Sequence, residues 1–325
     1  LSGGRSIDRS LAFLGLIGRQ LGPTGEAHLN VLTYHRIGTT ADDSILDPVL
    51  RSATPEEFDE QMALVRRRFS PVSIDQVVKA MEGTEELPAG AVLVTFDDAY
   101  RGVWEHALPS LKRHEIPATV FVPSAFPARA ELDFWWDRLY RSILRTERTM
   151  LVTPVGVFAV DNSTSRASVI ANAIARHVKT LPHDEAMRLV EELVDVLGTT
   201  EPINAVMSWE QLRDLSRSGI SIESHTRTHP ALDRLSPADL DSELVGSADD
   251  IEQHLGRRPV ALAYPTGQSS AEVHSAVCSA GYSVAFTTAS GCNDLSVADR
   301  LGLRRIDASG RVQASHLEAM LGPLG

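Results

Sequence analysis

The sequence has very few cysteines and no long apolar run. Only two of the 325 residues are cysteine, Cys278 and Cys292, and neither has a CxxC partner. This rules out a fold held together by disulfides, and we expect two inert thiols in a reducing compartment rather than a structural pair. No stretch reaches the roughly 18 uninterrupted apolar residues that a membrane-spanning helix needs, so no integral membrane span is expected.

Basic residues are also in the minority. The chain carries 31 Lys and Arg residues against 43 Asp and Glu, which gives a formal net charge of −12. With no long basic tract, nucleic acid and other polyanions are not expected as partners, and a neutral or cationic substrate fits better. The remaining composition, with 43% hydrophobic and 23% charged residues, is that of a globular protein with a large core.

The N-terminal region offers no clear secretory signal. The chain begins at Leu1 rather than Met, so its natural start could have been trimmed. Arg19 and Gln20 interrupt the apolar residues, and no A-x-A cleavage site follows. Residues 1–28 are therefore predicted to form an amphipathic helical segment. A cytoplasmic location is favoured, and a secreted or membrane-associated one stays open if a leader was removed.

Strand-like apolar runs alternate with helix-like segments along most of the chain. Several runs are continuously apolar, as strands covered on both faces are. Helices with Ser or Thr N-caps begin after Thr54, Ser208 and Ser236. This alternation predicts parallel strands with crossover helices, in either a barrel or a doubly wound sheet. The seven predicted strands are Leu29–Tyr34, Ala91–Phe96, Ala118–Val122, Gly219–Ser224, Val260–Tyr264, Ser283–Thr287 and Leu301–Ile306.

One region breaks this alternation. Between about residues 126 and 207 there is little strand signal beyond Val155–Val160. Two helical patterns, Ser165–Thr180 and Asp184–Leu197, fill most of it, and its low Gly and Ser content argues against a disordered linker. We therefore expect residues 29–325 to form one α/β body that carries a helical insertion at about 126–207.

Two clusters of polar residues follow predicted strands directly. Asp97 and Asp98 follow one, and His225 and His229 follow another. Each cluster alone could be structural, a capped turn in the first case and a pair of surface histidines in the second. Two imidazoles at i and i+4, however, can reach one metal ion. One Asp with two His makes a ligand triad with open positions, and the second carboxylate is then available as a general base.

Further polar and charged residues stand at the same kind of position. His35 follows the first predicted strand, Tyr264–Gly267 closes a later one, and Arg305 lies near the end of the last. Reactive groups gather at the carboxyl ends of the strands in α/β barrels. The sequence therefore predicts a single site built from these residues.

Three motifs of the sequence resemble those of a known family. Thr95-Phe96-Asp97-Asp98, His225-Thr226-x-x-His229 and Tyr264-Pro265-x-Gly267, in this order, resemble the polysaccharide deacetylase family, also called the NodB-homology domain or carbohydrate esterase family 4. The resemblance covers about residues 29–125 and 205–307. Tyr34-His35-Arg36-Ile37 and Leu303-x-Arg305-Ile306 look like flanking motifs of one branch of that family.

The resemblance implies a distorted (β/α) barrel with fewer or less regular strands than the eight-fold form. It also implies removal of N- or O-acetyl groups from sugars with a divalent metal, zinc in most members. Carried over to this chain, Asp98, His225 and His229 would hold the metal, and Asp97 would take the proton from the attacking water. The backbone amide near Thr266, in the segment that begins Tyr264-Pro265, would help to hold the oxyanion.

The chain departs from the best-known family pattern in two places. The arginine that often precedes Pro-x-Gly is absent, since Ala263 and Tyr264 stand there, and the late Leu-x-His motif with its acid histidine has no clear match. Arg305 could restore the positive charge near Asp97, or it could be a surface cation on an edge strand. His35 could serve as the proton donor.

Trp135 and Trp136 lie in Asp133-Phe134-Trp135-Trp136-Asp137, which looks like a segment of some long family members. Their rings could stack on a sugar or could pack the insertion against the barrel.

The sequence thus favours a metal-dependent deacetylase acting on an N-acetylated amino sugar in a glycan or glycoconjugate. One alternative is an amidohydrolase of the same fold that acts on a small N-acyl or cyclic amide substrate. The other is a carbohydrate-binding pseudoenzyme, which the missing acid histidine keeps open.

Overall fold

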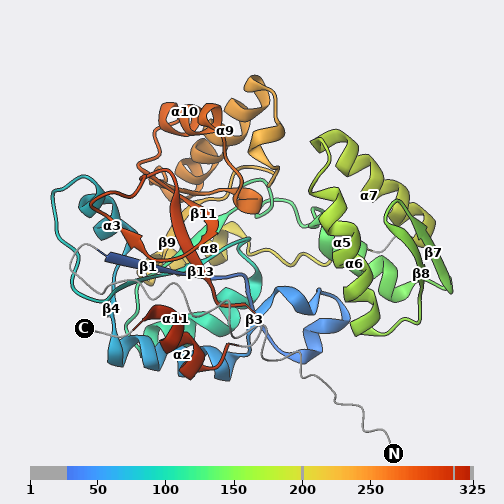
Figure 1. Cartoon of the computed structure of the whole chain (residues 1–325), viewed down its shortest axis with the longest axis horizontal. Coiled ribbons are helices and arrows are strands. Elements are labelled where there is room, and N and C mark those ends of the chain that lie inside the picture. Colours follow the sequence, from blue (N-terminus) through green and yellow to red (C-terminus); the bar gives the residue numbers. More distant parts are fainter. Residues whose placement is uncertain (1–27, 199–200, 310–311, 323–325) are drawn as a thin grey trace, which may run out of the picture.

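Seven parallel strands close into a barrel in the computed structural model, which describes residues 28–198, 201–309 and 312–322 (Figure 1). Going round the barrel, each strand pairs with the next, and β5 and β1 complete the ring. The strands in that order are β1 (His28–Tyr34), β13 (Leu303–Asp307), β11 (Val284–Ser290), β10 (Ala261–Ala263), β9 (Ser221–Ser224), β6 (Ala118–Val122) and β5 (Ala91–Phe96). These are the seven predicted strands, with β5 and β6 matching the predicted residues, and the predicted distorted (β/α) barrel is confirmed.

Short elements complete the sheet and its loops. Strand β4 (Ser70–Pro71) extends the sheet beside β5, and β12 (Asn293–Asp294) lies antiparallel to β1. A separate pair, β2 (Arg36–Ile37) and β3 (Arg51–Ala53), follows β1. The remaining short turns are η1 (Thr40–Ser44), η2 (Pro48–Leu50), the π-helical turn η3 (Val103–Ala107), η4 (Leu232–Arg234) and η5 (Pro265–Gly267).

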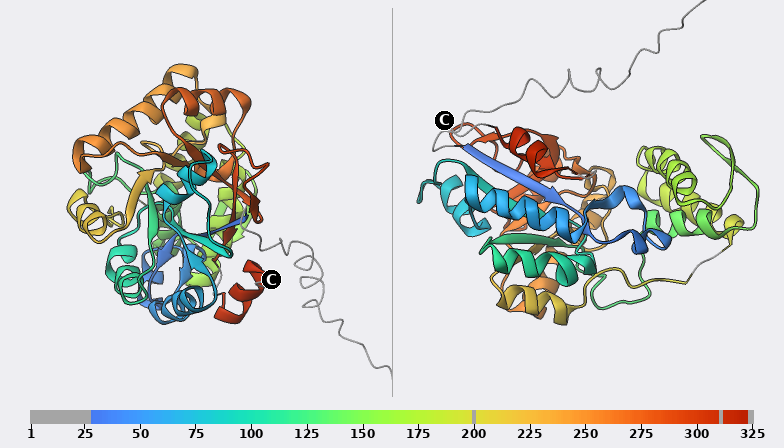
Figure 2. Two further views of the ribbon diagram at one scale, coloured as in Figure 1. Left: turned by 90° about the vertical axis from the view of Figure 1, so that its left-hand side faces the viewer. Right: turned by 90° about the horizontal axis from the view of Figure 1, so that it is seen from below.

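Helices surround the barrel (Figure 2). The helix after Thr54 begins at the predicted N-cap, and Thr54 and Glu57 form a capping box in which each side chain accepts from the other's backbone N–H group. Gly256 ends the long helix that starts after Ser236, in the left-handed conformation with φ 74°. The helices of the barrel are α2 (Pro55–Arg68), α3 (Ile74–Met81), α4 (Leu108–Arg113), α8 (Trp209–Arg217), α9 (Pro237–Leu255), α10 (Ala271–Ser279) and α11 (Ala314–Leu321).

Strand β5 shows why the barrel strands are apolar throughout. Val92 and Val94 pack with Phe58 of α2 in the layer outside the barrel. Leu93, on the opposite face, packs with Phe121 in a second cluster, which fills the inside. Both faces of the strand are therefore buried, which removes the alternation of apolar and polar residues that a half-exposed strand shows.

The insertion stands to one side of the barrel and has a core of its own (Figure 1). It contains α5 (Trp135–Arg145), the hairpin β7 (Met150–Thr153) and β8 (Gly156–Ala159), α6 (Thr164–Val178) and α7 (His183–Leu197). The two predicted helices correspond to α6 and α7, whereas the single predicted strand is half of a hairpin and α5 was not predicted. We propose that these elements make up the insertion expected at about residues 126–207.

Three further expectations concern the ends of the chain, the cysteines and membranes. The predicted N-terminal helical segment, residues 1–28, lies outside the described residues except for His28, which begins β1. Cys278 and Cys292 are both free thiols, as predicted. Within the described ranges, no helix has the length and apolar character needed to cross a membrane.

Candidate active site

The polar residues singled out in the sequence meet at the carboxyl ends of the barrel strands. The backbone N–H of Asp97 donates to the carbonyl oxygen of Tyr34 at 2.8 Å, so Asp97 extends the pairing of β5 with β1 by one residue. Asp98 then takes a left-handed conformation, with φ 66°. Such a backbone is uncommon for a residue other than Gly and marks a sharp turn. His229 is also left-handed, with φ 64°, in the loop after β9.

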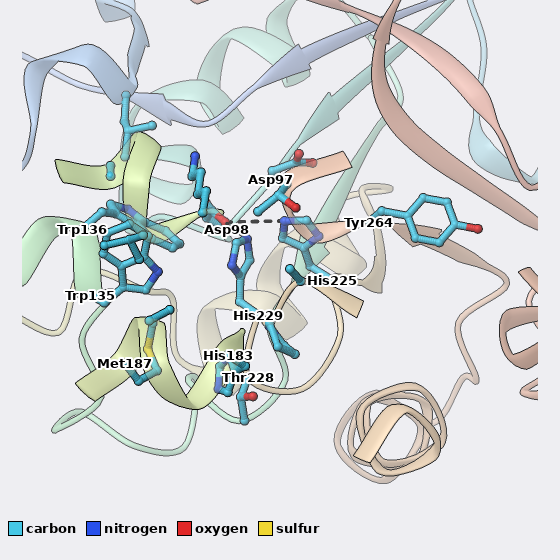
Figure 3. Close-up of a pocket in the computed structure, with 18 of the residues that line it drawn as sticks. Asp97, Asp98, Trp135, Trp136, His183, Met187, His225, Thr228, His229 and Tyr264 are labelled. Atoms are coloured by element: carbon cyan, nitrogen blue, oxygen red, sulfur yellow. Dashed lines mark ion pairs between the residues drawn. The ribbon is translucent and has the colours of Figure 1, made fainter. Parts of the chain in front are cut away.

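Asp98, His225 and His229 form a compact cluster (Figure 3). Oδ1 of Asp98 lies 3.6 Å from Nε2 of His225 and 3.4 Å from Nε2 of His229. One potential ligand atom from each residue falls within 4.8 Å of the other two. Oδ1 of Asp98 is buried and has no hydrogen-bond partner. A buried, unpaired carboxylate oxygen facing two imidazole nitrogens is the arrangement that a bound cation would satisfy.

The protonation states of the cluster also suit a metal ion. Nδ1 of His225 lies 2.7 Å from the carbonyl oxygen of Ala263. Because a carbonyl only accepts hydrogen bonds, Nδ1 carries the hydrogen and Nε2 presents a lone pair to Asp98. Burial lowers the pKa of His225 to about 4 and also holds the pKa of His229 well below its usual value. Both rings are therefore neutral at pH 7.

Among the described residues, Asp98 forms no ion pair with a lysine or arginine, whereas the adjacent Asp97 is paired with Arg305. Burial and the negative charge of Asp97 raise the pKa of Asp98 well above its usual value. A divalent cation would reverse this effect because it favours the ionised carboxylate. The three residues thus fit a divalent metal ion in donor type, protonation and spacing.

Asp97 forms a buried, bidentate ion pair with Arg305. Nη1 and Nη2 of Arg305 donate to Oδ1 and Oδ2 of Asp97 at 2.8 and 2.7 Å, and Nε donates to the carbonyl of Thr287 at 2.8 Å. Burial opposes ionisation of Asp97. The charge and hydrogen bonds of the Arg305 guanidinium, together with the nearby His225 and His35, outweigh burial and hold the pKa of this carboxyl well below its usual range. Arg305 is 3% exposed, so it is not the surface cation that was the alternative.

His35 lines the same cleft as the two aspartates. Its backbone N–H donates to Oγ of Ser52 at 2.9 Å, and its Nδ1 is buried without a hydrogen-bond partner. Burial lowers the pKa of His35, whereas the negative charge of Asp97 acts in the opposite direction. The ring is therefore neutral at rest. It lies near enough to Asp97 for the charge of that carboxylate to influence its pKa.

The segment Tyr264–Thr266 contributes backbone more than side chains. The ring of Tyr264 points away from the aspartates and histidines (Figure 3), and its hydroxyl donates to the carbonyl of Leu301 at 2.9 Å. Pro265 is buried, and Thr266 has a φ of 61° in the tight turn that follows. At Gly267 a Cβ atom would lie 2.0 Å from Oγ1 of Thr288, so this turn requires glycine.

Trp135 and Trp136 come from the insertion and line the other side of the cleft. Trp136 stacks on Phe134, with ring centroids 4.4 Å apart and planes inclined by 11°. Its Nε1 donates to the hydroxyl of Tyr100 at 2.9 Å. Trp135 packs against the core of the insertion. Both rings therefore pack against neighbouring residues and also line the cleft, so the two interpretations of Trp135 and Trp136, packing and contact with a sugar, are compatible.

The cleft lies between the barrel end and the insertion and has a volume of about 420 Å³. Its far wall was missed by the sequence analysis because helices α6 and α7 show only a pattern of burial, without any motif. Tyr100, which links the loop after β5 to the insertion, was also missed, because it belongs to no recognisable motif. The wall residues from the insertion include Ala171, Asn172, Ala175, Val178, Lys179, His183 and Met187.

Comparisons with known proteins agree with this site. The family model described as polysaccharide deacetylase matches residues 84–149 and 169–285, which is more than half of the chain. Among curated proteins, the poly-beta-1,6-N-acetyl-D-glucosamine N-deacetylase of Escherichia coli (strain K12) is 34% identical over 88 residues. That match covers 27% of this chain and only 12% of the E. coli protein.

Solved structures share the fold over nearly the whole chain. The deacetylase PplD of Streptococcus pyogenes has a TM-score of 0.61 at 19% identity, covering 92% of this chain and 100% of that one. IcaB from Ammonifex degensii has a TM-score of 0.59 at 19% identity, covering 92% and 99%. On the family match, which includes Asp97, Asp98, His225 and His229, the chain belongs to the polysaccharide deacetylase family.

Proposed function

We propose that this chain is a metal-dependent hydrolase that removes the acetyl group from an N-acetylated amino sugar in a glycan or glycoconjugate. The observation that carries the proposal is the unpaired, buried Oδ1 of Asp98, which faces two neutral imidazoles beside an ionised Asp97. A carbohydrate-binding protein without turnover would have no use for a second, ionised carboxylate at this position.

Asp98, His225 and His229 would hold one divalent ion, for which we propose zinc. Two nitrogen ligands and one oxygen ligand suit zinc, and three protein ligands leave an open position. When bound, such an ion polarises a carbonyl and lowers the pKa of water. The carbonyl of Ala263 keeps Nε2 of His225 free of hydrogen and oriented toward Asp98, as metal-ligating histidines require.

Asp97 is the proposed general base, which takes a proton from the attacking water. Its ion pair with Arg305 keeps the carboxylate ionised and fixes its plane. The low pKa that results makes Asp97 a weaker base than an isolated carboxylate. Arg305 therefore contributes orientation and the correct ionisation state rather than base strength.

His35 is the proposed donor of a proton to the leaving amine. Because burial holds its pKa low, the ring must gain a proton during the reaction. The proton that Asp97 takes from water would pass to His35, which returns Asp97 to its ionised form, and the negative charge of that carboxylate favours the protonated ring. His35 would then give this proton to the leaving amine. The backbone turn at Thr266 would present its amide to the oxyanion.

The proposed substrate follows from the cleft and the relatives together. The curated relative is named for the deacetylation of poly-beta-1,6-N-acetyl-D-glucosamine. Trp135 and Trp136 give this cleft an aromatic wall, which suits the apolar face of a pyranose ring.

An acetate-release assay on the purified, zinc-loaded protein tests the proposal. The substrates would be β-1,6- and β-1,4-linked N-acetylglucosamine oligomers, compared with small N-acetyl compounds and cyclic amides. Release of acetate from an oligomer supports the proposal. Turnover of only the small amides would favour the amidohydrolase alternative, and oligomer binding without any acetate would favour a pseudoenzyme.

A further inference from the structure

The two histidines of the cluster are supported in different ways. His225 is oriented by a hydrogen bond from its Nδ1 to the backbone carbonyl of Ala263 at 2.7 Å. For the ring of His229, no hydrogen bond to another residue is found within the described ranges, and only its backbone N–H is bonded, to Oγ1 of Thr226 at 3.1 Å. Apart from a hydrogen bond to its own backbone, the His229 ring is therefore oriented toward Asp98 by packing contacts.

Two aromatic rings from the insertion contact the His229 ring. The ring centroid of Trp136 lies 5.0 Å from that of His229, with the planes inclined by 64°. Phe134 lies 6.0 Å away, at 72°. Edge-to-face contacts of this kind are favourable and restrict ring rotation. Figure 3 shows Trp136 on the insertion side of Asp98 and His229.

Trp136 is itself held in place from the barrel. Its Nε1 donates to the hydroxyl of Tyr100 at 2.9 Å, and that hydroxyl donates to Oδ2 of Asp137 at 2.6 Å. Tyr100 and Asp137 are each 1% exposed. Oδ1 of Asp137 in turn accepts from the backbone N–H of Asp47 at 3.3 Å, which fastens α5 to the loop that leads into η2. The chain of contacts is thus buried and continuous up to the indole.

We propose that Trp136, fixed by Tyr100 and Asp137, is a positioning residue for the imidazole of His229, so that the first helix of the insertion completes the metal site. This inference rests on the proposed function in one respect, that Asp98, His225 and His229 hold a divalent ion. It assigns the insertion a part in the chemistry of the barrel, in addition to any contact with substrate.

Metal affinity of the apoprotein tests the inference without relying on catalysis. Wild type, Trp136→Phe and Tyr100→Phe would be stripped with a chelator and titrated with Co²⁺, following the visible absorption of the bound ion. Both substitutions keep an aromatic ring and all three ligands. Trp136→Phe replaces the indole and its hydrogen bond, whereas Tyr100→Phe keeps the indole and removes the hydroxyl that accepts from it and donates to Asp137. Groups that orient metal ligands typically contribute about 10- to 100-fold to affinity. We expect the Kd for Co²⁺ to be at least several-fold higher in each variant than in the wild type, with altered absorption bands.

Trp209 provides a matched control. It stacks on His254 with centroids 4.3 Å apart and planes inclined by 10°, and it is absent from the lining of the cleft. Trp209→Phe therefore perturbs a second Trp–His pair of the same chain. Thermal unfolding of all variants would show that each is folded at the titration temperature.

The outcomes separate this inference from the proposed function. Weaker Co²⁺ binding in the Trp136 and Tyr100 variants with unchanged binding in Trp209→Phe supports the inference. If Trp136→Phe and Tyr100→Phe both bind Co²⁺ with the affinity and spectrum of the wild type, the positioning role is wrong and the metal site stands. If the wild type itself binds no divalent ion, both the inference and the metal dependence fail.

Discussion

Arg305 and Asp97 form a bidentate ion pair between β13 and the loop after β5, joining residues 208 positions apart in the sequence. The arginine that the resemblance leads us to expect before Pro-x-Gly is absent from this chain, where Ala263 and Tyr264 stand. Arg305 brings a guanidinium to Asp97 from a different strand. We propose that Arg305 supplies the positive charge beside Asp97 that the missing arginine would otherwise provide.

Replacing Arg305 by Met should move the acidic limb of the pH profile. Without the guanidinium, burial is no longer outweighed, so the pKa of Asp97 rises toward or above its ordinary value. The acidic limb of kcat/KM would then lie at higher pH than in the wild type, and metal content would be unchanged. Arg305→Lys keeps the charge and is the control. An acidic limb that does not move in Arg305→Met would contradict this role.

The two adjacent carboxylates should respond differently to the loss of charge. Asp97→Asn should keep the metal but lower kcat by several orders of magnitude, because the base is lost and the ligand set is not. Asp98→Asn should weaken metal binding strongly, since one of three ligands is lost. Metal analysis beside kcat distinguishes the two. The reverse pattern, with metal lost in Asp97→Asn and kept in Asp98→Asn, would exchange the roles.

His35→Ala should lower kcat at every pH without loss of metal, because the donor of the proton to the leaving amine is lost while the ligand set is not. A general acid contributes about 10²- to 10⁴-fold in rate, so the decrease in kcat should be large. The histidines outside the cleft serve as comparison: His114 pairs with Asp59 at 2.9 Å, and His274 stacks on Tyr264. Full activity in His35→Ala would transfer the search for the proton donor to His106, His114 and His274.

Asp137 should make stability depend on pH. Burial raises the pKa of Asp137 from its ordinary value of 3.8 to about 7 in the folded protein. The folded state therefore binds this proton more tightly than the unfolded chain does, and its contribution to the free energy of unfolding falls as pH rises from about 4 to about 7. Asp137→Asn, which stays neutral, should lack this fall. Denaturant unfolding of both apoproteins at pH 5 and pH 7.5 would show it, and parallel curves would contradict it.

Much of the barrel could be predicted because its strands are buried on both faces and therefore leave continuous apolar runs. The ends of those runs also identified Asp97, Asp98, His225 and His229, since polar residues directly after a buried strand are conspicuous. Direction was harder to infer for Tyr264, which does line the cleft but whose ring points away from the aspartates and histidines. Neighbouring residues of a strand face opposite sides, so one residue was enough to change the side.

The insertion was less predictable. Helix α5 begins after Phe134, which provides no side-chain cap, and its first residues are two tryptophans with modest helix propensity. Its Arg141 is fully buried and forms an ion pair with Asp133, an arrangement that no local pattern of the sequence indicates. The far wall of the cleft depends in the same way on tertiary packing, which no local pattern in α6 or α7 reveals.

The most direct test of the account is metal reconstitution of the chelator-treated protein. Zn²⁺ would be added in steps below and above one equivalent per chain, and acetate release from an N-acetylglucosamine oligomer would be measured at each step. The account predicts almost no release from the metal-free protein, a linear rise with added Zn²⁺, and a plateau near one ion per chain that is lost in His229→Ala. Acetate release by the metal-free protein, or a plateau that persists in His229→Ala, would contradict it.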